Sequence, residues 1–282
     1  MKPAPFDYRR PGTLAEAVAA LAGESNAKVL AGGQSLVPLL SMRLAAPSLL
    51  VDINGISGLD RIEVSHDGAP GVRIGALARH AAVLASSDVR RVQPLVPMAL
   101  AHVAHATIRN RGTTVGSLVH ADAAAEMPMI LNLLGGHLEV EGPAGRRTIH
   151  ADDLYVGPLE SSVEHDEIAV AAFFPALAPG AGVGFEEIAR RHGDYALVGA
   201  AALVDGESVK VGYLSVSDVP TVVDLSGVAD ADLGATALEK LEPMGDIHAT
   251  AEYRAQLVRV LTERVVRSAR VSRQARQPKD VR

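Results

Sequence analysis

The sequence predicts an α+β protein of two domains. Its 282 residues are enough for two hydrophobic cores, and 48% apolar against 21% charged residues is ordinary globular composition. Stretches with strand patterns are followed by stretches with helix patterns, an order typical of α+β architecture. A Pro/Gly/Ala-rich segment at residues 176–182 reads as a linker. We therefore predict a first domain at residues 1–176, divided into subdomains at about 1–56 and 57–176, and a second domain at 177–282.

The first subdomain is predicted as a small βαβ-like unit. Thr13 and Glu16 have the spacing of a capping box, in which each side chain satisfies an exposed N–H group at the start of a helix. That helix is expected to run to Leu21. A strand at residues 28–30, a Gly-Gly turn, a helical or irregular segment and a strand at 48–53 complete the unit.

Turn residues and apolar periodicity define the remaining elements. Asp122 is expected as the N-cap of a helix that ends before a Gly-Gly pair. The second domain is expected to contain a three-stranded antiparallel sheet with helices, its last two strands joined at Asp205-Gly206. The predicted elements, in chain order, are strands 62–64 and 72–74, helices 78–85, 94–104 and 123–134, strands 137–141, 147–149, 168–174, 183–189, 196–204 and 209–217, and helices 238–241 and 251–269.

Composition excludes several classes of protein. Cysteine is absent, so this chain has no disulfides, thiolate zinc sites, cysteine nucleophiles or iron–sulfur clusters held by its own thiolates. The net charge of −6 argues against a nucleic-acid partner. No apolar stretch is long enough for a transmembrane segment, and the first ten residues lack the apolar core of a signal peptide. We expect a cytoplasmic protein.

The charge is unevenly distributed along the chain. Residues 264–282 carry seven basic side chains against one acidic one, Asp280. We favour a solvated, partly frayed terminal tail. A contact with an acidic neighbouring subunit is the alternative.

Two glycine-containing stretches carry the functional signal. Ala31-Gly32-Gly33-Gln34-Ser35 follows the end of a predicted strand. Because glycine lacks a Cβ and tolerates left-handed conformations, such a turn can aim several N–H groups at one anion, typically phosphate. A plain turn is the alternative for this stretch alone. The second stretch, residues 108–117, ends in Thr113-Thr114-Val115-Gly116-Ser117 and offers further N–H and hydroxyl donors.

With both stretches in view, the chain resembles the FAD-binding medium subunits of the molybdenum hydroxylases, the carbon-monoxide-dehydrogenase and xanthine-dehydrogenase type. The similarity covers nearly the full length. The family's first loop is complete at residues 31–35, and its second loop is matched at 113–117. Further short matches follow in the family's order at residues 120–126, 154–160, 190–196 and 248–254.

The resemblance implies a two-part FAD-binding domain of the PCMH type, followed by a smaller α+β domain, with FAD as the cofactor. It implies that the two loops bind the FAD pyrophosphate, that Glu126 binds ribose or ribityl hydroxyls, and that Tyr195 packs near the isoalloxazine ring. Glu126 could instead be a simple first-turn charge, and Tyr195 a core residue. The implied cofactor-binding residues are Ala31, Gly32, Gly33, Gln34, Ser35, Thr113, Thr114, Val115, Gly116, Ser117, Glu126 and Tyr195.

One residue departs from the family pattern. Val115 stands where the family usually has glycine, and a β-branched residue resists positive φ. One interpretation is that the backbone at Val115 has an ordinary negative φ. The other is that the loop is displaced, so that FAD binds more weakly than in the rest of the family. Arg109 and Arg111 are expected either to add positive charge at the pyrophosphate or to be solvated. A metal site formed by His120, Asp122 and the pair His102 and His105, which a helix would place on one face, is not favoured.

The resemblance also implies a division of labour. A large molybdopterin subunit oxidises the substrate, a small subunit with [2Fe–2S] clusters carries the electrons, and FAD on this chain passes them to an external acceptor. We therefore expect an oxidoreductase subunit without catalytic side chains of its own, in a dimer of heterotrimers. Two alternatives are a self-sufficient FAD oxidoreductase and a flavin-free scaffold subunit, for which Val115 is the hint.

Overall fold

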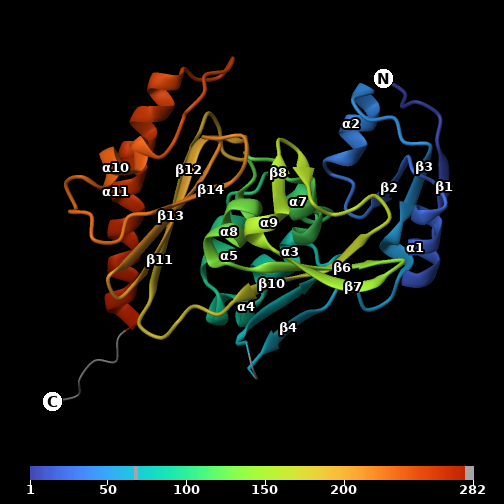
Figure 1. Ribbon diagram of the computed structural model, residues 1–282, viewed down its shortest axis with the longest axis horizontal. Coiled ribbons are helices and arrows are strands. Elements are labelled where there is room, and N and C mark those ends of the chain that lie inside the picture. The colour runs from blue at the N-terminus through green and yellow to red at the C-terminus, as the bar shows by residue number, and fades with distance from the viewer. Residues whose placement is uncertain (67–68, 277–282) are drawn as a thin grey trace.

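The computed structural model describes residues 1–66 and 69–276, and its strands form four sheets in that part of the chain (Figure 1). The sheets of three and five strands lie in the N-terminal part, together with a two-stranded hairpin, β8 (Tyr155–Gly157) and β9 (Glu160–Ser161). A four-stranded sheet with the long helix α11 (Ala251–Arg276) forms the C-terminal part. No helix in residues 1–66 or 69–276 is long and apolar enough to cross a membrane.

The first sheet is parallel, in the order β1-β3-β2, and is built from β1 (Asp7–Arg9), β2 (Ala27–Leu30) and β3 (Leu49–Asp52). Helix α1 (Leu14–Ala22) joins the first two strands, α2 (Leu36–Met42) joins the last two, and η1 (Ile53–Gly55) follows. The predicted capping box is confirmed, because Thr13 accepts from the N–H of Glu16 and the Glu16 carboxylate accepts from Thr13. Sequence pattern missed β1, a three-residue exposed edge strand.

The second sheet is antiparallel, in the order β4-β5-β10-β6-β7. Successive side chains along each strand point to opposite faces of the sheet, so one face is buried and the other faces outward. Val72, Ile74 and Leu138 point into the core, whereas Arg73 and Glu139 point away from it. The strands are β4 (Ile62–Ser65), β5 (Gly71–Gly75), β6 (His137–Gly142), β7 (Gly145–His150) and β10 (Ile168–Pro175).

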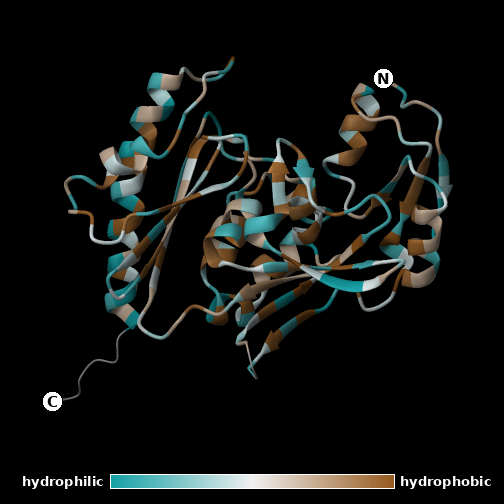
Figure 2. Cartoon of the chain, in the orientation of Figure 1, coloured by the Kyte–Doolittle hydropathy of each residue, from teal (hydrophilic) through white to brown (hydrophobic). Residues whose placement is uncertain are grey.

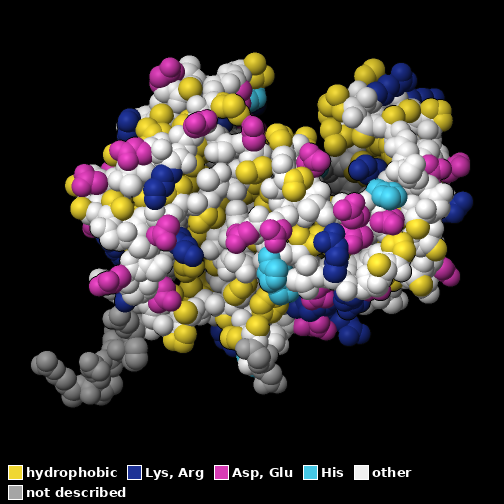
Figure 3. Space-filling view, viewed as in Figure 1, with side chains coloured by type: hydrophobic (Ala, Val, Ile, Leu, Met, Phe, Trp, Pro, Cys, Tyr) yellow, Lys and Arg dark blue, Asp and Glu magenta, His cyan; other side chains and the backbone are white. Residues whose placement is uncertain are grey.

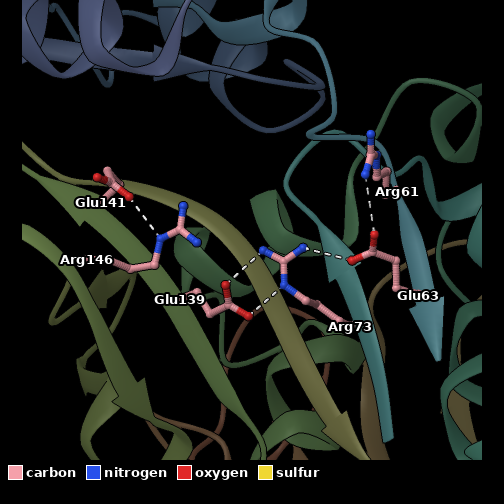
Figure 4. A network of polar contacts seen from close by, with 6 residues as sticks. All are labelled: Arg61, Glu63, Arg73, Glu139, Glu141 and Arg146. Carbon is pink, nitrogen blue, oxygen red and sulfur yellow. Dashed lines mark hydrogen bonds and ion pairs between the residues drawn. The ribbon is translucent and has the colours of Figure 1, made fainter. Parts of the chain in front are cut away.

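A network of ion pairs crosses the outer face of this sheet (Figure 4). Arg73 reaches over β10 to form a bidentate pair with Glu139, with N–O distances of 2.7 and 2.8 Å, and also meets Glu63 at 3.4 Å. Arg146 pairs with Glu141 at 2.9 Å. These partly exposed contacts connect four strands laterally.

Short helices cover the inner face of the same sheet. They are shorter and more numerous than predicted, because new helices begin after the N-cap residues Ser86, Pro94 and His105. The predicted helix at 94–104 ends at Leu100. The predicted N-cap Asp122 lies before its helix, whose N-cap is Ala125. The helices are α3 (His80–Ala85), α4 (Ser87–Val92), α5 (Leu95–Leu100), α6 (Ala106–Arg109), α7 (Thr114–His120), α8 (Glu126–Leu134) and α9 (Ala151–Leu154).

The C-terminal sheet has four antiparallel strands, so the prediction of three was wrong. The missed strand, β14 (Thr221–Asp224), is too short to show a period, and it forms only because β13 offers a free edge. The other strands are β11 (Gly182–Ala189), β12 (Ala196–Asp205) and β13 (Ser208–Leu214).

Helices cover both faces of this sheet. Helix α11 lies on one face with α10 (Leu233–Glu239) beside it, and α8 of the N-terminal part packs on the other. Strand β12 is therefore buried along nearly its whole length. Gly184 lets α11 approach closely, because a Cβ there would lie 2.4 Å from the carbonyl oxygen of Val265. Figure 2 shows that the outer side of α11 is largely hydrophilic.

The prediction of a solvated, partly frayed basic tail is wrong on fraying for residues 264–276, which are helical, although Arg264, Arg267 and Arg276 are exposed. Helix α11 continues to Arg276, and several of its arginines have partners inside the chain. Arg264 pairs with Glu186 at 2.7 Å, and Arg273 donates to the carbonyl oxygens of Gly180 and Gly206. Lys279 and Arg282 lie outside the described residues.

Candidate functional site

The first glycine loop leaves β2 and enters α2. Gly33 has φ of 73°, a conformation that a side chain would strain, and its carbonyl oxygen accepts from the N–H of Val37 as α2 begins. Within the described part of the chain, no acceptor is bonded to the N–H groups of Gly32, Gly33, Gln34 or Ser35. Four free donors in one turn are a set that an anion can satisfy.

The second glycine stretch lies directly against the first. A Cβ on Gly32 would be 2.4 Å from the carbonyl oxygen of Arg111 and 2.9 Å from the Cα of Gly112. These are backbone atoms, so only glycine permits the approach. The two loops, about eighty residues apart in sequence, therefore meet backbone to backbone. They converge beside the lobe that carries α2, and Figure 3 shows the surface hollowed there.

Side chains from two other elements bind the loops together. Asn54, in η1, donates to the carbonyl oxygen of Ala31 at 2.8 Å. Arg79, just after β5, donates to the Asn54 side-chain oxygen at 2.6 Å and to the carbonyl oxygen of Arg111 at 2.7 Å. Asp52 orients Asn54 by accepting from its amide at 2.6 Å. The chain thus holds both loops through one continuous set of hydrogen bonds.

The second loop becomes a helix sooner than expected. Thr113 is the N-cap of α7, and its hydroxyl accepts from the N–H of Gly116 at 3.1 Å. Val115 is therefore an ordinary helical residue without positive φ, and its side chain is buried in the core. The expected strain at Val115 is absent, and with it the hint of a flavin-free scaffold.

Two of the predicted cofactor-binding residues use their hydroxyl groups within the protein itself. Thr113 caps α7, and Thr114 is fully buried with its hydroxyl 3.3 Å from Nδ1 of His80. Burial and the nearby Arg109 charge lower the pKa of His80 to about 4, so its imidazole is neutral at pH 7. Ser35 and Ser117 remain partly exposed at the loops. Arg109 donates to the carbonyl oxygens of Val103 and Ala104, which makes it a support for the turn before α6.

A second cluster lies at the far end of α7. Seven helical residues place it about 10 Å from the glycine loops. Glu126 opens α8, Asp122 precedes it, and Tyr195 comes from the turn between β11 and β12. Tyr195 is 63% exposed, and its hydroxyl lies near the carboxyl groups of Asp122 and Glu126. Partial burial of that hydroxyl and the charges of Asp122 and Glu126 raise the pKa of Tyr195 to about 12.

Glu126 is unusual among the carboxyl groups of the chain. Its burial, followed by the negative charge of Glu187 in β11, raises its pKa to about 8. It is therefore largely protonated at neutral pH, which argues against the alternative of a simple first-turn charge. The exposure of Tyr195 likewise argues against the alternative of core filling.

The two histidines weighed as metal ligands do not share a helix face. Helix α5 ends before them; His102 Nδ1 lies 3.2 Å from Glu187 Oε1, and His105 stacks on His192 with ring centroids 6.0 Å apart. In residues 1–66 and 69–276, no group of three or more His, Cys, Asp or Glu side chains is arranged to hold a metal ion.

Sequence reasoning missed the residues that hold the loops, and it also missed Glu187 beside His102. Asn54 and Arg79 belong to no glycine motif and lie well outside both loops in sequence. The available signal was weak: Asp52-Ile53-Asn54-Gly55 follows a buried strand, where Asx turns are common, and Arg79-His80 follows another. Neither pattern says which backbone the side chains will reach.

The geometry fits a dinucleotide with a diphosphate. One end offers free N–H groups on a glycine turn, which is the donor set that a diphosphate needs. The other end, one short helix away, offers a protonated carboxyl group and an exposed aromatic ring, which suit hydroxyl groups and a flat ring system.

Comparison with known proteins agrees with this geometry. A family profile described as "FAD binding domain in molybdopterin dehydrogenase" matches residues 4–177. The 6-hydroxypseudooxynicotine dehydrogenase complex subunit alpha of Paenarthrobacter nicotinovorans is 39% identical, with 95% of this chain and 96% of the relative covered. The carbon monoxide dehydrogenase medium chain of Hydrogenophaga pseudoflava is 32% identical, with 95% and 98% covered.

Solved structures show the same fold. Reconstituted CO dehydrogenase from Oligotropha carboxidovorans contains a chain that superposes with a TM-score of 0.90 at 31% identity, with 96% of this chain and 100% of that chain covered. A chain of quinoline 2-oxidoreductase from Pseudomonas putida 86 gives a TM-score of 0.88 at 36% identity, with 97% and 100% covered. The chain therefore belongs to the FAD-binding medium subunits of the molybdenum hydroxylases, and its cofactor is FAD.

Proposed function

We propose that this chain receives electrons from the [2Fe–2S] clusters of a small partner subunit and passes them through FAD to an external acceptor. A large molybdopterin subunit would oxidise the substrate, and the complex would be a cytoplasmic dimer of heterotrimers. FAD, when bound, supplies the redox chemistry. Two features support the proposal: the family of the chain, and the absence of cysteine, since the iron–sulfur ligands must then come from another subunit.

The single observation that carries the FAD site is the contact of Gly32 with the backbone of Arg111 and Gly112. Because of it, the free N–H groups of residues 32–35 lie beside the loop that starts α7. We propose that both loops bind the diphosphate through residues 31–35 and 113–117, the latter contributing mainly Gly116 and Ser117. Glu126 would bind a ribose or ribityl hydroxyl, and Tyr195 would pack near the flavin ring.

We also propose that residues 1–176 are the FAD-binding domain, with subdomains at about 1–56 and 57–176, and that residues 177–282 form the C-terminal domain. Support comes from the sheets, because the parallel sheet ends at Asp52, the five-stranded sheet ends at Pro175, and β11 starts at Gly182. The C-terminal domain would contribute Tyr195 and Glu187 and thereby close one side of the flavin site.

The test is reconstitution followed by partner-dependent reduction. The purified chain should take up FAD in a one-to-one ratio and show the visible absorbance of bound flavin. That absorbance should bleach when the reduced small subunit is added, but not when an organic substrate of the molybdenum subunit is added alone. Bleaching by the substrate without partners would support a self-sufficient oxidoreductase, and failure to take up FAD would support the scaffold.

A further inference from the structure

One buried arginine ties together the strand ends beside the proposed flavin position. Arg254 lies in the first turn of α11, and only 8% of its side chain is exposed. Its Nη1 donates to the carbonyl oxygen of Leu197 at 2.9 Å and to that of Ser215 at 2.6 Å. Its Nη2 donates to Asp246 Oδ2 at 2.6 Å. A single guanidinium group therefore connects β12, the end of β13 and the loop before α11.

The first of these carbonyl groups belongs to a β-bulge. Opposite β11, Ala196 and Val198 of β12 pair with consecutive residues, so Leu197 is the extra residue of the bulge. The ladder from β12 to β13 also stops short of it, at the pair of Gly199 with Leu214. Arg254 thus binds a carbonyl group at an interruption of the sheet. Because bulges redirect the chain beside them, this contact holds the strand end that carries Tyr195, two residues earlier.

Ser215 extends the contact to the N-terminal part of the molecule. It follows β13 directly and has φ of 60°, a left-handed conformation that non-glycine residues rarely adopt. Its N–H donates to the carbonyl oxygen of Ala123 at 2.9 Å, and its own carbonyl oxygen accepts from Arg254. A strained residue persists only when its surroundings hold it, and these two bonds do so from both sides. Ala123 lies in the turn that leads into Glu126.

Stability alone does not explain this arrangement. Among the described residues, Arg254 Nε is buried and makes no hydrogen bond. A buried cation with a free donor and a left-handed serine each cost free energy. Such costs gather where a binding site requires a particular backbone placement, and here they lie beside Tyr195 and the turn before Glu126.

We propose that Arg254 is a positioning residue for the flavin end of the FAD site. By holding the two strand ends, it sets the spacing between Tyr195 and Glu126, which contact the isoalloxazine ring and the ribityl chain in the proposed function on which this inference rests. Asp246, whose side chain is 46% exposed, orients the guanidinium group from the outer side. The diphosphate end lies about 10 Å away along α7, is held by Arg79 and Asn54, and does not depend on Arg254.

The same helix provides a matched control. Arg273 also donates to two backbone carbonyl oxygens, those of Gly180 at 3.0 Å and Gly206 at 2.9 Å. At 1.5 Å per residue it lies about 28 Å from Arg254 along α11. Arg254→Met and Arg273→Met therefore each remove a charged donor from two carbonyl groups, but only the first does so beside the flavin end.

The first experiment compares FAD with ADP, which contains a diphosphate but no flavin. Both are titrated into the FAD-free chain by calorimetry. Arg254→Met should raise the FAD dissociation constant about tenfold and leave that of ADP within about twofold, because only FAD reaches the flavin end. Arg273→Met should change neither constant by more than about twofold.

Equal weakening of FAD and ADP by Arg254→Met would show a general structural role and overturn the proposal. Unchanged FAD affinity in that variant would overturn it as well, while the diphosphate site would stand. A wild-type chain that binds no FAD would instead refute the proposed function.

The second experiment uses Arg254→Lys, which carries the test if Arg254→Met does not fold. Lysine keeps the charge but lacks the planar fork that reaches three acceptors, so FAD affinity should fall only about threefold, again without a matching loss for ADP. The visible absorbance and fluorescence of the bound flavin, which depend on its contact with Tyr195, should differ from the wild type in Arg254→Lys and not in Arg273→Met. A wild-type flavin spectrum and affinity in Arg254→Lys would overturn the positioning role.

Discussion

The close approach of the two glycine loops makes Gly32→Ala the sharpest test of the site. The new Cβ would lie 2.4 Å from the Arg111 carbonyl oxygen, 2.9 Å from the Gly112 Cα and 3.1 Å from the Arg111 carbonyl carbon. All three are backbone atoms, so no side-chain rotation relieves the clash. Arg79 already holds the Arg111 carbonyl at 2.7 Å, so the second loop is not free to retreat.

The expected magnitude follows from overpacking. Forcing a methyl group into a fully packed contact typically costs about 1–3 kcal/mol. If this energy must be recovered when FAD draws the loops together, the FAD dissociation constant rises between roughly fivefold and a hundredfold. The assay is a titration of the FAD-free chain with FAD, followed by flavin absorbance and fluorescence.

Gly12→Ala is the matched control. Gly12 is in the same subdomain, and its added Cβ would meet only a Glu16 carboxylate oxygen at 3.7 Å, an ordinary contact. This variant should bind FAD within about twofold of the wild type, as expected for a surface substitution that touches nothing. If Gly32→Ala binds FAD as the control does and is equally stable, the two loops do not meet as described and the diphosphate site has to be abandoned.

Three further predictions follow from the contacts described above. Arg79→Met removes two hydrogen bonds that a charged group donates, one to Asn54 and one to the Arg111 carbonyl oxygen. FAD binding should therefore weaken about tenfold or more in the same titration. Unchanged affinity would show that Arg79 does not support the loops. Arg254→Met leaves the carbonyl oxygens of Leu197 and Ser215 unpaired and should lower the free energy of unfolding by about 2–4 kcal/mol in a urea titration, whereas a loss under about 1 kcal/mol would contradict this. Glu126→Gln should stabilise the FAD-free chain at pH 9 but not at pH 4. The pKa of Glu126 in the folded chain, about 8, is above its ordinary value of 4.5. The protonated Glu126 side chain therefore contributes fully to stability below pH 4.5, and this contribution is lost as the pH rises through 8. Urea unfolding at both pH values should show a difference that grows by about 2–4 kcal/mol, and a difference that does not depend on pH would refute the assignment.

Local patterns predicted most of the regular elements. The capping box at Thr13 and Glu16, the hairpin of β6 and β7, and the strands β10 to β13 are encoded by neighbouring residues, so they could be read directly. The failures were short or edge elements such as β1 and β14, which contain only three and four residues. Such strands form because a neighbouring strand offers free hydrogen-bonding groups, and that neighbour is far away in sequence.

In the site too, features set by adjacent residues were predicted, whereas features set by residues distant in sequence were not. The motif at residues 31–35 predicted an anion-binding turn, and Gly33 adopts the positive φ that this turn needs. The prediction of backbone strain at Val115 came only from its position, where the family usually has glycine. The structure removes it, because the Thr113 cap makes the following residues helical.

By itself, the sequence determined the α+β class, the family, the cofactor and the lack of cysteine ligands for an iron–sulfur cluster, because these depend on composition and on motifs of a few adjacent residues. Only the tertiary structure decided that Gly32 meets Arg111, that Arg79 and Asn54 hold both loops, and that Glu187 raises the pKa of Glu126. The physical reason is that close packing, hydrogen bonding and charge repulsion depend on distances in space. Chain folding sets those distances between residues that no local pattern connects.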